Sequence, residues 1–151
     1  MSRTRRVYVA SSWRNHAQPG VVQAIRDAGH EAYDFKAPSA GNSGVHWSEI
    51  DPAWQGWAPQ AFSAALEHPV AQSGFQHDWN AMEWADTGVL VLPCGRSAHL
   101  EAGYFTGAGK DLFILLTEPQ EPELMYRMAT RVCLSQDELL ACLGQPVSSV
   151  A

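Results

Sequence analysis

The 151-residue chain is 46% hydrophobic and 17% charged, which is the balance of an ordinary globular protein and leaves room for one domain, over 1–151. Its formal net charge of −6 speaks against a nucleic-acid duplex as partner, because binding to phosphates needs a basic surface. No stretch approaches the roughly 18 apolar residues of a membrane span, and the N-terminus lacks an apolar signal core. We therefore expect no membrane partner.

Two further features bear on the surroundings in which the chain works. Its three cysteines are an odd number without a CxxC pair, which suits a reducing cytosol better than a secreted disulfide scaffold, so we predict a cytoplasmic protein. The arginines at positions 3, 5 and 6 are too few to offset the acidic balance. We interpret this run as a solvated N-terminal tail.

The first elements in chain order predict a β-α-β unit. Residues 6–10 form a short β-rich run, and an apolar face at helical spacing follows over 21–28, with Pro19 suited to the first turn and Gly29 to the stop. Residues 30–35 predict a second strand. Such a unit implies parallel pairing with a right-handed crossover.

Residues 36–59 differ from the rest, because prolines and glycines alternate there with tryptophans such as Trp47. A loop of this length inside a domain is usually a functional lid or binding loop, or else an unrecognised element. Two helices are predicted after it, over 60–67 and 73–85.

The remaining chain alternates strands and helices. Residues 88–92 are apolar at every position, which is typical of a central parallel strand buried on both faces. The later predicted elements are a helix over 98–108, a strand over 112–116, a helix over 123–130, a strand over 131–133 and a helix opened by a capping box at Ser135. The whole predicts an α/β three-layer sandwich with about five parallel strands, of the flavodoxin or Rossmann kind.

Ligands of such sheets bind beyond the carboxyl ends of the strands, where helix N-termini offer unpaired N–H groups. This rule selects residues 11–15, the loop over 36–59, and residues 94–101. Gly95, Arg96 and Ser97 are typical of an anion-binding turn, although a plain strand-to-helix turn with Ser97 as N-cap would use the same residues.

Carboxylates near this edge are the candidate reactive groups. His99 and Glu101 are predicted in the first helical turn, where the helix dipole stabilises a carboxylate. Asp78 is predicted near the N-terminal end of its helix, and Asp86 follows that helix. Two carboxylates converging on one cleft would suit cleavage of a glycosidic bond, whereas a solvated face would also explain either aspartate.

Two other chemistries are disfavoured by spacing. A metal site from His77, Asp78, His99 and Glu101 matches no recognised zinc pattern such as HExxH. The stretch from Gly95 to His99 also lacks the second glycine of a GxSxG nucleophile elbow.

Two blocks carry a family resemblance: the stretch VYVASSWR over 7–14, and an ordered series over 78–110. The series consists of Asp78, an Ala-Asp pair ending at Asp86, an apolar strand, Glu101 followed by small residues, and Gly109-Lys110. Together they resemble the nucleoside 2-deoxyribosyltransferase superfamily, which includes the 2′-deoxynucleoside 5′-monophosphate N-glycosidases.

The resemblance implies roles for individual residues. Glu101 matches the nucleophile that forms a covalent glycosyl-enzyme, Asp78 the residue that assists departure of the base, and Tyr8 the residue that orients the nucleophile. Ser12 and Arg14 match residues that grip a 5′-phosphate in the monophosphate-cleaving branch. The remaining expected substrate contacts are Ser11, Trp47, Asp86, Gly95, Arg96, Ser97 and His99.

The expected activity is therefore cleavage or transfer of the N-glycosidic bond of a (deoxy)nucleoside or nucleoside 5′-monophosphate, with no metal or other cofactor. Flat bases would stack on the tryptophans of the 36–59 loop, although these could equally fill a core. The Arg and His before Glu101 depart from the family pattern, so a non-catalytic nucleotide-sensing module remains an alternative. An NAD-type glycohydrolase is a third possibility. The resemblance also implies a homodimer or larger homo-oligomer, with residues 119–127 reaching a neighbour's site.

Overall fold

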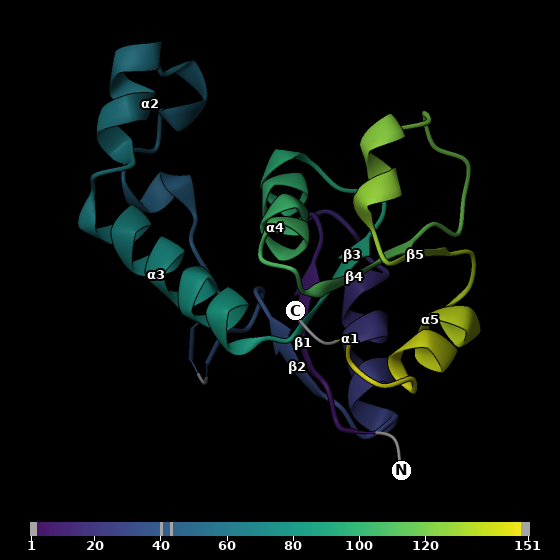
Figure 1. Ribbon diagram of the computed structural model, residues 1–151. Helices are drawn as coiled ribbons and strands as arrows, with labels where there is room; N and C mark the ends of the chain where they lie inside the picture. The colour runs from purple at the N-terminus through teal and green to yellow at the C-terminus, as the bar shows by residue number, and fades with distance from the viewer. Residues whose placement is uncertain (1–2, 40, 43, 149–151) are drawn as a thin grey trace. The chain divides into compact units, whose positions relative to one another are not determined.

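The computed structural model describes residues 3–39, 41–42 and 44–148 of the chain (Figure 1). The chain forms two compact units, Met1–Asp34 with Met82–Ala151, and Phe35–Ala81. We call the first the sheet unit and the second the insert unit. The single domain expected over 1–151 stays a prediction.

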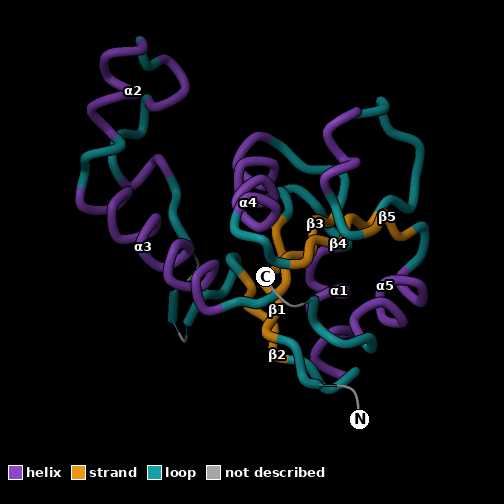
Figure 2. The backbone as a smooth tube through the Cα atoms, viewed as in Figure 1, coloured by secondary structure: helices purple, strands orange, loops and turns teal. Residues whose placement is uncertain are grey.

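The sheet unit is built on five parallel strands in the order β2-β1-β3-β4-β5 (Figures 1 and 2). Its strands are β1 (Arg6–Ala10), β2 (Glu31–Asp34), β3 (Thr87–Val91), β4 (Asp111–Leu115) and β5 (Arg131–Cys133). This order is the flavodoxin-like one, in which the chain reverses direction across the sheet between β1 and β3. The predicted α/β fold with a parallel sheet is confirmed.

Helices cover both faces of this sheet. The helices of the sheet unit are α1 (Gln18–Asp27), α4 (Arg96–Gly107) and α5 (Gln136–Leu143), with a 3-10 helix, η3 (Leu124–Met128). The core on the α1 and α5 face joins Ile25 and Leu139 to strand residues such as Val9 and Val89. Alternate strand residues point to the other face, where Tyr8 packs against Phe105 of α4. The sheet is thus the middle of three layers, as predicted.

The insert unit holds the tryptophan-rich segment. It contains two 3-10 helices, η1 (Trp47–Glu49) and η2 (Trp54–Gly56), then α2 (Pro59–Ala65) and most of α3 (Pro69–Trp84), whose last turn belongs to the sheet unit. Trp47 meets Trp57 edge to face at 6.0 Å, and the Trp57 indole N–H donates to Asp51 at 2.7 Å. Residues 36–59 are therefore locally structured by their own aromatic contacts.

Element ends differ from the predicted ones more than element positions do. α3 begins at Pro69, four residues before the predicted start, and α4 begins at Arg96, two residues before. Residues 123–130, predicted as a helix, form the shorter η3. The helix does not continue to residue 130, because the Thr130 N–H donates to the Leu112 carbonyl of β4 at 2.8 Å and so begins the pairing with the sheet.

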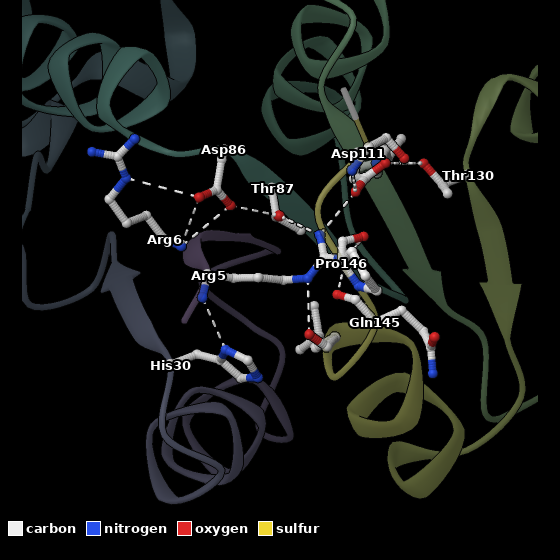
Figure 3. Close-up of polar contacts among 12 residues, drawn as sticks. Arg5, Arg6, His30, Asp86, Thr87, Asp111, Thr130, Gln145 and Pro146 are labelled. Atoms are coloured by element: carbon white, nitrogen blue, oxygen red, sulfur yellow. Dashed lines mark hydrogen bonds and ion pairs between the residues drawn. The ribbon is translucent and has the colours of Figure 1, made fainter. Parts of the chain in front are cut away.

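The expectation of a solvated tail is wrong for Arg5, which is only 1% exposed. Its guanidinium donates to the Asp111 carboxylate and to the Thr87 hydroxyl, both at 2.8 Å (Figure 3). It also donates to three backbone carbonyls at the end of α5 and just after it, those of Leu143, Gln145 and Pro146. A buried guanidinium needs such partners to offset the lost hydration. Arg5 is therefore a structural residue at the amino ends of the strands.

Gly88 in β3 offers a test of the packing between α4 and the sheet. A methyl group at this position would lie 2.7 Å from the Phe105 ring, which is itself buried. We expect Gly88→Ala to lower the free energy of unfolding by about 1–3 kcal/mol, because an overpacked core must shift. Urea unfolding measures the change. Gly103→Ala is the matched control, since a Cβ there meets nothing within 4 Å and should not destabilise; equal stability of both variants would contradict the packing described.

Among the described residues, no helix combines the length and the apolarity that crossing a bilayer requires.

Candidate active site

The loops after β1 and β3 are fastened together at the carboxyl edge of the sheet. The Ser11 hydroxyl donates to the Val91 carbonyl at 2.8 Å, and the Asn15 side-chain amide donates to the Pro93 carbonyl at 3.1 Å. Ser11 and Asn15 are both buried. They therefore hold the two ligand-facing loops of a doubly wound sheet in register. Asn15 lies in the predicted ligand-facing segment 11–15 but was given no role of its own, because a loop asparagine gives no local signal of a contact 78 residues away.

Ser12 and Arg14 lie in the same loop. The Ser12 hydroxyl accepts from the Arg14 backbone N–H at 3.1 Å, and the Ser12 carbonyl accepts from the Asn15 N–H at 3.0 Å. The Arg14 side chain is exposed. The loop thus presents a guanidinium at the carboxyl edge, where an anionic group of a ligand would bind.

The turn after β3 leads into α4 and presents its first N–H groups. Gly95 is the N-cap residue, and no side chain caps the helix. The expectation that Ser97 would be the N-cap in a plain turn is wrong, because α4 starts at Arg96 and Ser97 already lies in its first turn. Gly95, Arg96 and Ser97 are exposed. Uncapped N–H groups at a helix start favour binding of an anion or of a ligand oxygen.

Glu101 lies in the second turn of α4, not in the first as predicted, so stabilisation by the helix dipole is weaker than expected. Its side chain is half-buried. Burial raises the pKa of the neighbouring Cys94 thiol to about 12, and the negative charge of Glu101 acts in the same direction. Cys94 therefore stays a neutral thiol at neutral pH, and Glu101 is the nucleophilic candidate of the pair.

Tyr8 is brought to the side of α4 that carries Glu101. Tyr8 belongs to β1 and its ring is fully buried. The centre of the ring lies 5.2 Å from that of Tyr33 and 5.8 Å from that of Phe105. Phe105 follows Glu101 by four residues, so the two share one side of the helix. The expected orienting residue and the expected nucleophile thus belong to the same side of α4 in the sheet unit.

The opposite side of α4 borders a separate cavity of about 260 Å³. It is lined by the α4 residues His99, Ala102, Gly103 and Thr106, by the strand residues Leu90, Leu112 and Ile114, and by the η3 segment residues Glu123, Met125, Tyr126 and Met128. His99 contacts its own turn and Tyr126 through its two ring nitrogens. His99 was expected among the substrate contacts, whereas Tyr126 was expected only as part of residues 119–127, which were to reach a neighbour's site.

Asp86, an expected substrate contact, lies at the other end of β3. It directly precedes Thr87, the first residue of the strand, and its carboxylate accepts from the Arg6 backbone N–H at 3.2 Å and from the Thr87 hydroxyl at 2.8 Å (Figure 3). Parallel strands bind ligands at their carboxyl ends. The structure thus shows a strand-anchoring role for Asp86 instead of a place among the ligand-facing loops.

Asp78 and Trp47 belong to the insert unit. Asp78 is half-buried and is the tenth of the sixteen residues of α3, so its predicted place near the start of the helix is wrong. The helix begins earlier than the apolar pattern indicates, because Pro69 suits a first helical position. Trp47 is partly buried against Trp57.

Within the described residues, no group of three or more His, Cys, Asp or Glu side chains could hold a metal ion. His77 lies with Nδ1 2.8 Å from the Ser73 carbonyl oxygen of its own helix.

Comparison with known proteins gives a likeness in structure. No protein-family model matches the chain, and no curated protein matches it in sequence. The structure of a 2-deoxyribosyltransferase from Bacillus psychrosaccharolyticus is similar with a TM-score of 0.57 at 17% identity, over 95% of this chain and 98% of the other. The chain has the nucleoside 2-deoxyribosyltransferase fold.

Two further structures share this fold. The CMP N-glycosidase of Clostridium botulinum is similar with a TM-score of 0.52 at 15% identity, over 93% of this chain and all of the other. A conserved protein from Enterococcus faecalis V583 has a TM-score of 0.59 at 15% identity, over 93% of this chain and 98% of the other. The resemblance stated from the sequence is thus confirmed at the level of the fold.

Proposed function

We propose that the chain is an enzyme that cleaves or transfers the N-glycosidic bond of a (deoxy)nucleoside or nucleoside 5′-monophosphate, with Glu101 as nucleophile. The observation that carries the proposal is the position of Glu101. This half-buried carboxylate lies on the side of α4 that also bears Phe105, against which Tyr8 packs, and α4 starts at the ligand edge of the sheet. Two enzymes of the same fold act on glycosidic bonds, according to their names.

The proposed reaction is a double displacement. A Glu101 carboxylate oxygen attacks C1′ of the sugar and forms an ester bond, while the bond from C1′ to the base nitrogen breaks and its electron pair leaves with the base. Asp78 supplies a proton to the departing base. In the second step, water or another base attacks C1′ and gives up a proton to the Asp78 carboxylate, while the ester bond breaks and its electron pair returns to Glu101. Tyr8 orients the carboxylate for its attack and for its departure.

The loop after β1 and the turn after β3 are the proposed grip for the non-reacting part of the substrate. Arg14, with Ser12 beside it, presents a guanidinium, and the turn at Gly95 presents Arg96 and the first N–H groups of α4. These donors suit a 5′-phosphate. Bases would stack on tryptophans of the insert unit such as Trp47.

Incubation of the protein with nucleosides and nucleoside 5′-monophosphates, with and without an acceptor base, tests the proposal. Release of free base measured by chromatography is expected, and base exchange distinguishes a transferase from a hydrolase. Tight nucleotide binding without turnover would instead favour the sensing module. Release of nicotinamide from NAD would favour the glycohydrolase.

We also propose a homo-oligomer in which residues 119–127 reach a neighbouring copy. Large apolar side chains around η3 and on α4 support it, since Leu100, Leu124 and Met125 are 79%, 77% and 56% exposed. Large apolar side chains exposed to this extent favour association. Sedimentation velocity at micromolar concentration is expected to show a dimer or larger species, and a monomer would contradict the proposal.

A further inference from the structure

We propose that His99 is a positioning residue that fixes the direction of the Arg96 N–H at the start of α4, and that Tyr126 holds His99 in place. The inference rests on the proposed function, because it assigns this N–H to the turn that faces the substrate. It differs from the expectation that His99 itself contacts the substrate. Three observations lead to it: the partners of the imidazole, the geometry of the turn, and the side of α4 on which His99 lies.

Both ring nitrogens of His99 are occupied within the protein. Nδ1 lies 2.7 Å from the Gly95 carbonyl oxygen and 3.7 Å from the Cys94 sulfur, and Nε2 lies 2.8 Å from the Tyr126 hydroxyl oxygen. A carbonyl oxygen only accepts, so Nδ1 carries the hydrogen, and Nε2 of the neutral ring accepts from the Tyr126 O–H. Burial, together with the negative charge of Glu123, raises the pKa of Tyr126, which keeps its proton available for this bond. The two rings also stack at 5.8 Å.

The bond from His99 to the Gly95 carbonyl orients a whole peptide group. In a trans peptide the C=O and the following N–H point in opposite directions, so fixing the Gly95 carbonyl fixes the Arg96 N–H. Side-chain packing does not hold this turn, because Gly95 has no Cβ and a Cβ placed there would meet nothing within 4 Å. No side chain caps the helix either. The Gly95 carbonyl also accepts the first backbone hydrogen bond of α4, from the His99 N–H, but at 3.4 Å this bond is long. The imidazole, at 2.7 Å, therefore holds the turn more tightly than the backbone bond alone would.

His99 acts from the side of α4 that faces away from Glu101. Its neighbours there are Thr106 and Tyr126, which line the same cavity. Loss of the imidazole should consequently disturb the donor that binds the non-reacting part of the substrate and leave the attacking carboxylate in place. Uniform loss of substrate and transition-state binding raises KM and leaves kcat nearly unchanged.

The test compares three variants of the full chain with the wild type, using a nucleoside 5′-monophosphate that the wild type cleaves. His99→Phe keeps the stacked ring and removes both hydrogen bonds, and we expect KM to rise about tenfold with kcat within about twofold. Tyr126→Phe should raise KM about threefold, because the imidazole keeps its bond to Gly95 but loses its anchor. His99→Gln retains an amide donor and should recover part of the affinity.

Thr106→Val is the matched control, because it changes a polar group on the same side of α4 and in the same cavity without touching the turn. Its KM should equal that of the wild type. An equal rise in KM for Thr106→Val, an unchanged KM in His99→Phe, or a fall in kcat alone would each overturn the inference.

Nitrogen-15 NMR of the histidines gives a readout that does not depend on activity. The wild type should show His99 as the Nδ1–H tautomer, and Tyr126→Phe should show the same tautomer, because the bond to the Gly95 carbonyl still requires a hydrogen on Nδ1. An Nε2–H tautomer in the wild type overturns the inference even if the enzyme is active. If the wild type releases no base, the proposed function fails. The role of His99 can still be decided from two measurements, the tautomer by NMR and the Kd for the nucleotide by calorimetry, which then takes the place of KM.

Discussion

Glu101→Gln is expected to lower kcat for base release by about a thousandfold or more, because it replaces the nucleophilic carboxylate with a neutral amide, which attacks C1′ poorly, while keeping the size of the side chain. Binding of the substrate should persist, since the donors at Arg14 and at the Gly95 turn are unchanged. Steady-state assays of base release, with calorimetric titration of the same nucleotide, measure the two effects separately.

Glu31→Gln is the matched control for this experiment. Glu31 is an exposed carboxylate at the first residue of β2, at the end of the strands opposite the ligand edge. Its replacement removes the same charge from the sheet unit and should leave kcat and KM unchanged. If Glu101→Gln turns over like Glu31→Gln, Glu101 is not the nucleophile.

The proposed ester also predicts a covalent species. Acid quenching of the wild type during turnover, followed by mass spectrometry, should show a sugar or sugar phosphate attached to the peptide that contains Glu101. The adduct should be missing from Glu101→Gln. An enzyme that releases base at the normal rate without any adduct on this peptide would use direct attack by water instead.

The parts of the fold that the sequence predicts well are those encoded by neighbouring residues. The apolar run over 88–92 marks a buried strand, observed as Thr87–Val91, because a strand covered on both faces is apolar at nearly every position. Gly29 and Gly109 mark helix ends because their positive φ angles, 93° and 74°, suit glycine. Such signals need no knowledge of the rest of the chain.

Helix starts are predicted less well, and this shifts two site residues along their helices. The apolar pattern marks the side of a helix that packs, whereas the first turn is exposed at Pro69 and Arg96 and carries no such pattern. Glu101 moves from the first turn to the second, and Asp78 from the beginning of α3 to its second half. The roles proposed for the two carboxylates depend on the residue type and are unchanged. The stabilisation of Glu101 by the helix dipole is weaker than expected.

Contacts between distant segments are what the sequence could not provide. Asn15, Asp86 and Arg5 each take their roles from residues 76 or more positions away. A short charged run at the N-terminus has the same local pattern whether it is solvated or buried. Arg5 is buried only because the strands pair in the order β1, β3, β4, which brings the first residues of β3 and β4 to the same edge as Arg5.

Arg5→Met is expected to lower the free energy of unfolding by about 3–5 kcal/mol, because it leaves the Asp111 carboxylate buried without its cation. Arg5 and Asp111 are 1% and 3% exposed, and their atoms lie 2.8 Å apart (Figure 3). Arg5 also joins β3, through Thr87, to the chain at Leu143, Gln145 and Pro146. Equilibrium unfolding in urea, monitored by tryptophan fluorescence, measures the loss.

Arg6→Met is the matched control next to it in sequence. The Arg6 side chain is 45% exposed, and its guanidinium lies 3.8 Å from the Asp86 carboxylate, so this ion pair should contribute at most about 1 kcal/mol. The double variant Arg5→Met with Asp111→Leu should be more stable than Arg5→Met alone, because no buried charge is left unpaired. A double variant that is less stable than both single variants would show that the buried pair is not the source of the loss.

The same ion pair predicts how stability depends on pH. Burial alone would raise the pKa of Asp111, but hydrogen bonds from Arg5 and Ser148 together with the Arg5 charge outweigh it and hold the pKa below its ordinary value. The unfolded state therefore binds this proton first, at a pKa of about 3.9, and the stabilisation is complete above that pH. It is lost as the pH falls from there through the lower pKa of the folded state. Acid unfolding of the wild type should consequently be steeper below about pH 4 than that of Asp111→Asn, which has no carboxylate to protonate; parallel curves would place the acid sensitivity elsewhere in the fold.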